Sequence, residues 1–246
     1  MTDRPYKISA EWSSRQESAR ACAQRLARTL TGLAAISPIF AQWNKKGESR
    51  ETANDPFCTM PPDIGELTDI VQCAETVRDA TGEPWPELGY HLGTWNGVDD
   101  PFDAGLTLAV GEYADSRRFS NVVTLSPPDL CPETKQLYDL DRMTDLAMIL
   151  ARAWTPDFVQ VEPFLLSVRV YPGPEKLMPV RAGWITYLKP DFARLVTPPP
   201  SVLSRMTADG GLLMMTGTDP LDPDDPKQIK TLLEVQKALE PLNREP

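Results

Sequence analysis

Three strand-like segments follow one another in the middle of the chain with no helical pattern between them. They are Leu88–Trp95, Gly105–Tyr113 and Asn121–Leu125, separated by Asn96-Gly97 with an acidic loop and by residues 114–118. Consecutive strands joined by turns pair antiparallel, because a parallel pair needs a crossover of a dozen or more residues. The pattern therefore predicts an antiparallel meander and argues against a doubly wound parallel sheet.

Helical patterns surround these strands. Apolar residues at Cys22, Leu26 and Leu33 predict an amphipathic helix. Its outer side carries Arg20, Arg25 and Arg28. Three further helices are expected: one capped by Asp63 that continues through Val77, one over Glu133–Trp154, and one that begins at Asp225-Pro226, continues through Leu239 and stops at Pro241.

The remaining apolar segments predict further strands. These are Tyr6–Trp12, Phe158–Val161, Phe164–Tyr171, Ala182–Leu188, and a hairpin of Val202–Met206 with Leu212–Thr216. The class expected is α+β, with antiparallel sheet segments and about four main helices. Residues 1–246 are expected to form a single domain, and an internal pseudo-repeat with halves 1–155 and 156–246 would explain a two-fold rhythm of strands and helix.

Charge narrows the class of partner. The net charge is −10, and residues 51–150 alone carry 5 basic against 19 acidic side chains. This excess argues against direct nucleic-acid binding, which needs clustered lysine and arginine, and favours a basic partner. No apolar run is long enough to span a bilayer and no secretory leader is evident, so a soluble, cytoplasmic protein is expected. Four irregularly spaced cysteines, with Cys22 and Cys73 on apolar helix faces, predict buried thiols rather than a disulfide frame or zinc site.

Catalytic motifs are missing. His91 is the single histidine, in a predicted strand, and a structural role is expected for it. No nucleophile elbow, phosphate-binding loop, dinucleotide fingerprint or zinc-protease motif occurs. We therefore expect no enzyme activity, no catalytic residues, no cofactor and no metal.

Two groups of carboxylates resemble metal-binding or catalytic sets, and a simpler structural role is expected for each. Asp219, Asp222, Asp224 and Asp225 lack the central glycine and distal glutamate of a calcium loop, so an exposed turn leading into a helix cap is expected. Asp129, Glu133 and Lys135 resemble the carboxylate–lysine set of metal-dependent nucleases. That chemistry needs carboxylates from adjacent strands, whereas Glu133 and Lys135 are expected to open a helix.

Several segments carry a family resemblance. They are the N-terminal strand and helix, the Ile36-Ser37-Pro38 to Trp43–Arg50 stretch, the G-x-x-x-G-x-W-N-G segment at Gly89–Gly97, and G-W-x-T-Y-L at Gly183–Leu188. Together they resemble the bacterial immunity protein 52 family over most of the chain. Members are encoded beside polymorphic or type VI secretion toxins with a restriction-endonuclease-like nuclease domain. The resemblance implies a protein that binds and neutralises such a toxin.

The residues suggest where such a partner would bind. A nuclease must present basic groups to phosphates, so an acidic surface would steer toward it and cover it. The expected partner-binding set combines acidic residues with aromatic anchors: Asp99, Asp100, Asp103, Glu112, Asp115, Trp95, Phe102 and Tyr113. The alternatives are a secretion adaptor or chaperone for an effector, and a metal-dependent nuclease.

Overall fold

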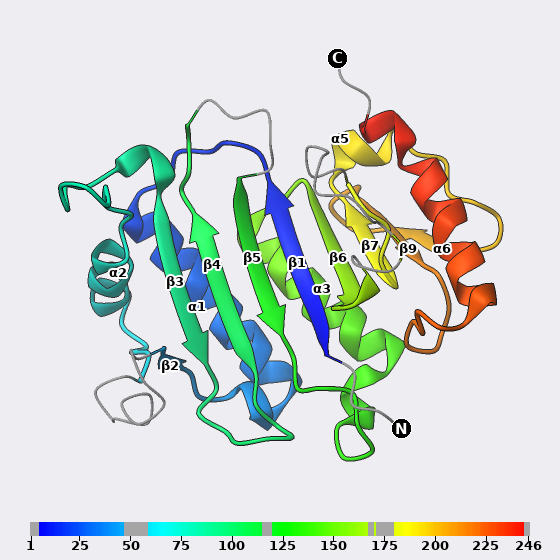
Figure 1. Ribbon diagram of the computed structural model, residues 1–246, viewed down its shortest axis with the longest axis horizontal. Coiled ribbons are helices and arrows are strands. Elements are labelled where there is room, and N and C mark those ends of the chain that lie inside the picture. The colour runs from blue at the N-terminus through cyan, green and yellow to red at the C-terminus, as the bar shows by residue number, and fades with distance from the viewer. Residues whose placement is uncertain (1–4, 47–58, 115–119, 167–169, 171–179, 244–246) are drawn as a thin grey trace. The chain divides into compact units, whose positions relative to one another are not determined.

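The computed structural model describes residues 5–46, 59–114, 120–166, 170 and 180–243 (Figure 1). Within them the chain is α+β, as predicted, and the strand pairs are antiparallel. The described helices are α1 Ala19–Ile36, α2 Ile64–Cys73, α3 Leu140–Trp154, α5 Pro190–Ala193 and α6 Pro226–Ala238. The described strands are β1 Tyr6–Trp12, β2 Asn44–Lys45, β3 Tyr90–Trp95, β4 Gly105–Val110, β5 Asn121–Ser126, β6 Phe158–Pro163, β7 Ile185–Leu188, β8 Leu203–Met206 and β9 Leu212–Met215.

The chain divides into two compact units. Unit 1 comprises residues 1–10 and 129–246, and unit 2 comprises residues 11–128. The first division falls inside β1, so this strand contributes residues to both units. The second falls at Pro128–Asp129.

Unit 2 contains the predicted meander. Its strand order is β2-β3-β4-β5 followed by the last residues of β1. Leu92, Leu106 and Leu108 point to one face and are buried, and α1 lies along that face (Figure 1). From α1, Cys22, Leu26 and Leu33 are fully buried, as their spacing predicted. Burying a leucine contributes about 1.5–3 kcal/mol, so this contact is the main source of stability for the layer.

Unit 1 has the strand order β1-β6-β7-β9-β8. Only the first residues of β1, up to Ala10, belong to this unit. The predicted hairpin is confirmed, since Leu203 pairs with Met215 and Met206 with Leu212. Tyr6 on β1 is 2% exposed, and its hydroxyl donates to the Leu221 carbonyl at 2.7 Å. The predicted last helix is also confirmed, because the Asp225 side chain accepts the Lys227 N–H at its N-terminus.

Three expectations about the helices are wrong. The second helix is capped by Asp63 as predicted but ends at Cys73, because residues 74–77 pair in extended form with the chain before β3. Cys73 is exposed, since it lies two positions after buried Val71 and therefore about 200° around the helix. The third helix begins at Leu140 rather than Glu133, because the backbone of Asp139 is extended.

Other expectations fall partly outside the described residues. Of the strand expected at Phe164–Tyr171, Phe164 and Leu165 form a turn and Leu166 is helical, whereas residues 167–169 and 171 lie outside the described part. Cys58 lies outside it too, while Cys22 and Cys131 are buried free thiols. Burial raises the pKa of Cys22 to about 12, which keeps this thiol protonated at neutral pH. No helix in the described part of the chain is both long enough and apolar enough to cross a membrane.

Candidate partner-binding surface

The connection between β3 and β4, residues 97–104, contains four of the eight residues of the predicted set and is called the acidic loop here. Asp99, Asp100 and Asp103 are exposed, and Phe102 is half-buried among them. Half-buried Trp95 lies at the end of β3, immediately before the loop. The loop itself contains no basic residue, although Lys45 on the neighbouring strand β2 pairs with Thr94.

Asn96 holds the acidic loop in place. Its side chain is 2% exposed and uses both faces of the amide. The Nδ2 group donates to the carbonyls of Phe102, at 2.8 Å, and Ile39, at 3.1 Å. The Oδ1 atom accepts the N–H groups of Ala104, at 2.9 Å, and Val98, at 3.3 Å. All four hydrogen-bonding positions of the amide are used, so one buried side chain ties the loop to itself and to the segment before β2.

Glu112 and Tyr113 lie at the opposite end of the same sheet. β4 leads away from the acidic loop, since Gly105 pairs with Trp95 and Val110 with Tyr90. Six residues of antiparallel strand span roughly 17 Å, so the predicted set is divided into two groups. Both Glu112 and Tyr113 are half-buried. Asp115, the last predicted member, lies outside the described residues.

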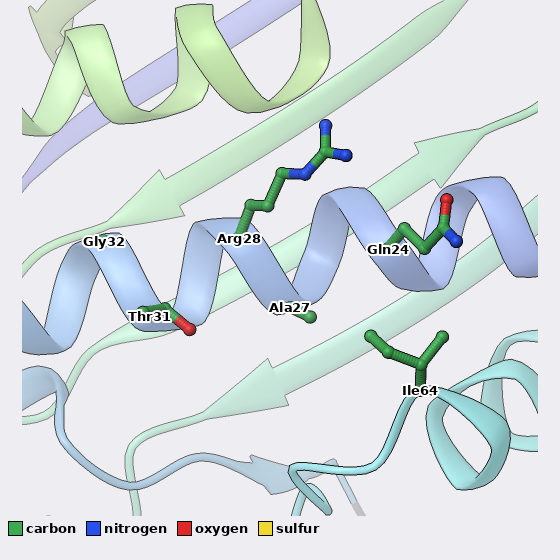
Figure 2. Close-up of a pocket in the computed structure, with 6 residues that line it drawn as sticks. All are labelled: Gln24, Ala27, Arg28, Thr31, Gly32 and Ile64. Atoms are coloured by element: carbon green, nitrogen blue, oxygen red, sulfur yellow. The ribbon is translucent and has the colours of Figure 1, made fainter.

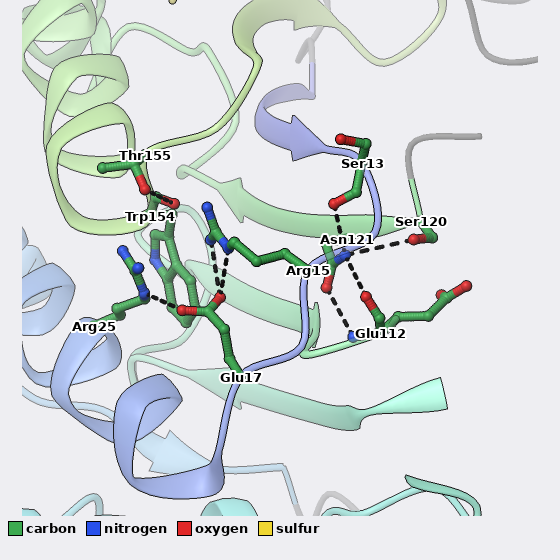
Figure 3. Close-up of polar contacts among 9 residues, drawn as sticks. All are labelled: Ser13, Arg15, Glu17, Arg25, Glu112, Ser120, Asn121, Trp154 and Thr155. Carbon is green, nitrogen blue, oxygen red and sulfur yellow. Dashed lines mark hydrogen bonds and ion pairs between the residues drawn. The ribbon is translucent and has the colours of Figure 1, made fainter. Parts of the chain in front are cut away.

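A second buried asparagine holds the backbone at this far end. Asn121, which is fully buried, accepts the Glu112 N–H at 3.0 Å and donates to the Glu112 carbonyl at 3.0 Å (Figure 3). It also donates to the Ser13 carbonyl at 3.2 Å, and the Arg15 N–H donates to the Glu112 carbonyl at 2.8 Å. The backbone of Glu112 is therefore fixed against the segment that leads into α1.

The chain between α2 and β3, residues 74–89, forms an irregular two-stranded arm that sequence reasoning missed. Thr76 donates to the Gly89 carbonyl at 2.9 Å and accepts from the Trp85 N–H at 2.7 Å. Its exposed residues include Val77 and three carboxylates, at Asp79, Glu83 and Glu87. The arm adjoins the Glu112 group, because the Glu87 carbonyl accepts the Tyr113 N–H at 3.0 Å. Gly82 and Pro84 belong to this arm, in which Pro84 pairs with Val77.

Fewer arginines contribute to the basic face predicted for α1 than the sequence suggests. Arg28 is exposed beside a shallow hollow of about 560 Å³ lined by Gln24, Ala27, Arg28, Thr31 and Gly32 with Ile64 (Figure 2). Arg25 instead turns toward Glu17, with 2.6 Å between Nε and Oε1 (Figure 3). Arg15 contacts the other carboxylate oxygen of Glu17 at 2.9 Å. The carboxylate of Glu17 therefore forms ion pairs with two arginines, Arg15 and Arg25.

The residues that resemble a catalytic set in the sequence do not form one in the described structure. Asp129 accepts a hydrogen bond from the Thr134 hydroxyl through its backbone carbonyl. Glu133 is exposed in a turn, and Lys135 is exposed at the start of a short 3-10 helix before α3. These three residues belong to one connecting segment rather than to adjacent strands. In the ranges that the structure describes, no three histidine, cysteine, aspartate or glutamate side chains gather closely enough to hold a metal ion. His91 is exposed on β3, and its backbone N–H donates to the Ala74 carbonyl at 2.9 Å.

Comparison with known proteins places the chain in a family. A solved structure described as Pseudomonas aeruginosa T6SS protein PA0821 has a similar fold, with a TM-score of 0.57 at 12% sequence identity. The similarity covers 97% of this chain and 73% of that one. No curated protein matches the sequence. The family model for Immunity protein 52 matches residues 4–242, nearly the whole sequence, and the chain therefore belongs to the Immunity protein 52 family.

Proposed function

We propose that this protein neutralises a cognate nuclease toxin of a type VI or polymorphic toxin system by binding it in the cytoplasm, without catalysing a reaction. Family membership supports the immunity role, and the fold shared with a type VI secretion protein supports that setting. Binding rather than turnover agrees with the side chains in the described residues, where the carboxylates weighed for catalysis lie in a single connecting segment.

The acidic loop is the feature that supports a nuclease as the partner. Three exposed carboxylates stand within five residues, and Asn96 holds their backbone in one conformation. A nuclease must keep a basic surface for the phosphates of its substrate, and a fixed acidic surface is complementary to it. Phe102 and Trp95, half-buried at the same end of the sheet, would add apolar contact at the centre of the interface.

The test is a nuclease assay with purified components. Toxin encoded by the neighbouring gene is mixed with increasing amounts of this protein, and cleavage of DNA and of RNA is followed. Cleavage should fall to background at a 1:1 molar ratio, while the toxin stays intact on a gel. An unrelated nuclease in the same buffer serves as the control and should keep its activity.

The assay also separates the alternative roles. A secretion adaptor or chaperone would form the complex and leave cleavage unchanged. A nuclease would itself cleave substrate in the absence of toxin. Either result would refute the proposed function.

A further inference from the structure

The strand β8 lies at the end of the sheet in unit 1, and among the residues that the structure describes it pairs with β9 on one side only. All four of its residues are exposed, including Leu203 at 49% and Met206 at 63%. An exposed edge strand with large apolar side chains is unusual, because natural proteins generally shield such edges from pairing with other chains. This edge is a different surface from the acidic loop of unit 2.

The hydrogen-bonding pattern shows which backbone groups of β8 face away from β9. The Thr207 N–H donates to the Gly211 carbonyl at 2.8 Å, in register with the pairing of Arg205 with Leu213. In an antiparallel ladder, bonded pairs alternate with non-bonded pairs. The N–H and C=O groups of Leu203 and Arg205 therefore point toward β9, whereas those of Ser204 and Met206 point to the open edge.

Arg205 decides what can pair there. If two copies of β8 paired through Ser204 and Met206, Arg205 would stand directly opposite the same arginine of the second copy. Like charges directly opposite each other destabilise a strand pair, so this residue opposes self-pairing in that register. An acidic residue opposite Arg205 would instead form a favourable cross-strand pair.

We propose that the β8 edge binds an extended segment of a partner protein by strand addition, with an acidic residue opposite Arg205 and apolar residues opposite Leu203 and Met206. Backbone hydrogen bonds through Ser204 and Met206 supply the affinity, and the side-chain pairs supply the selectivity. The segment runs antiparallel to β8. This inference does not depend on the proposed function.

A designed peptide tests the proposal. The probe is a capped hexapeptide of threonine, valine, glutamate, threonine, valine and threonine, in that order, and the control peptide has lysine in place of the glutamate. Hydrogen exchange is followed by NMR on the full-length chain. The Ser204 and Met206 amides should become protected on peptide addition, whereas those of Leu203 and Arg205, already bonded to β9, should not change. The lysine peptide should bind about fivefold more weakly, since the cross-strand pair becomes repulsive.

Two variants complete the experiment. Arg205→Glu should reverse the preference between the two peptides while leaving the backbone contacts intact. Ser204→Pro removes an outward N–H and should abolish binding without breaking a bond to β9. Equal binding of both peptides, or no protection at Ser204 and Met206 at millimolar peptide, would overturn the proposal. Dimerisation of the unmodified chain that Ser204→Pro abolishes would also overturn it, because the edge would then bind a second copy.

Discussion

Individual buried amides fix the loops of unit 2. Asn96 and Asn121 stand at opposite ends of the sheet, and each satisfies backbone groups that no strand pairing reaches. A buried backbone group without a partner costs about 1–3 kcal/mol. Because each amide pairs several such groups, it stabilises its loop by more than a single hydrogen bond would. Asn96 continues the inward positions of Leu92 and Thr94 along β3, which is the sequence pattern that could have revealed it.

Replacing Asn96 should therefore loosen the acidic loop. Asn96→Asp keeps the size of the side chain but sets a carboxylate oxygen against the carbonyls of Ile39 and Phe102, in place of the donor. We expect a loss of about 2–4 kcal/mol in the free energy of unfolding, measured by urea denaturation at pH 7. Val98→Ala in the same loop removes two methyl groups from a residue that is 38% exposed, leaves the Val98 N–H in place, and should cost less than about 0.5 kcal/mol. Equal losses in the two variants would show that Asn96 does not hold the loop.

At the scale of elements, the β8–β9 hairpin depends on the turn that joins its strands. Asp209 accepts the Tyr187 hydroxyl at 2.7 Å and also accepts from the Thr207 hydroxyl and the Gly211 N–H. Partial burial raises the pKa of Asp209, but these hydrogen bonds outweigh it and hold the pKa below its ordinary value. Burial, then the hydrogen bond to Asp209, raises the pKa of Tyr187.

The lowered pKa of Asp209 makes the hairpin sensitive to acid. A group whose folded pKa is depressed adds stability above its unfolded pKa, about 3.9 for aspartate, and this stability is lost as pH falls through the folded pKa. Asp209→Asn should therefore lower the urea midpoint at pH 7, with a difference that shrinks below about pH 4. Asp219→Asn, at an exposed site of the same unit, is the control and should show little difference at either pH. A constant Asp209→Asn effect from pH 7 to pH 3 would contradict the role assigned to the ionised carboxylate.

The arm shows why some elements were not predictable. Leu67, Val71 and Val77 share a helical spacing, and local pattern alone extends α2 through them. The chain leaves the helix after Cys73 because Thr76 finds backbone partners at Trp85 and Gly89. Such pairing depends on the segment that follows the helical pattern, and the apolar spacing of residues 67–77 carries no information about it. The cap at Asp63 was predictable because its hydrogen bonds reach only two and three residues ahead.

At the scale of the whole molecule, charge is distributed unevenly between the two units. Unit 2 holds 17 acidic and 10 basic residues of a chain with a net charge of −10, and unit 1 holds the remaining 18 acidic and 15 basic residues. The field that steers a basic partner is the sum over such a distribution, and it weakens as salt screens it. The acidic loop is the densest group of exposed carboxylates in the predicted set.

Reversing the charge of the loop should slow association with the toxin. We expect the triple variant Asp99→Lys, Asp100→Lys and Asp103→Lys to associate at least roughly tenfold more slowly at low salt, with a smaller difference at high salt. Stopped-flow fluorescence measures the rate. The matched control reverses three exposed carboxylates of unit 1, Asp219, Asp224 and Glu240, and so changes the net charge equally. If both variants slow association to the same extent, net charge rather than the loop controls steering.

The sequence by itself determined the fold class, the helix starts at Asp63 and Asp225, the terminal hairpin and the acidic character of the middle of the chain. Each of these depends on neighbouring residues or on composition, and both can be read directly from the sequence. Only the tertiary structure decided that the predicted acidic and aromatic residues form two groups, because a six-residue strand separates Trp95 from Glu112 in space. It also decided that Asn96 and Asn121 anchor these groups and that Arg205 stands on an open edge, since hydrogen bonds between distant segments exist only in the folded chain.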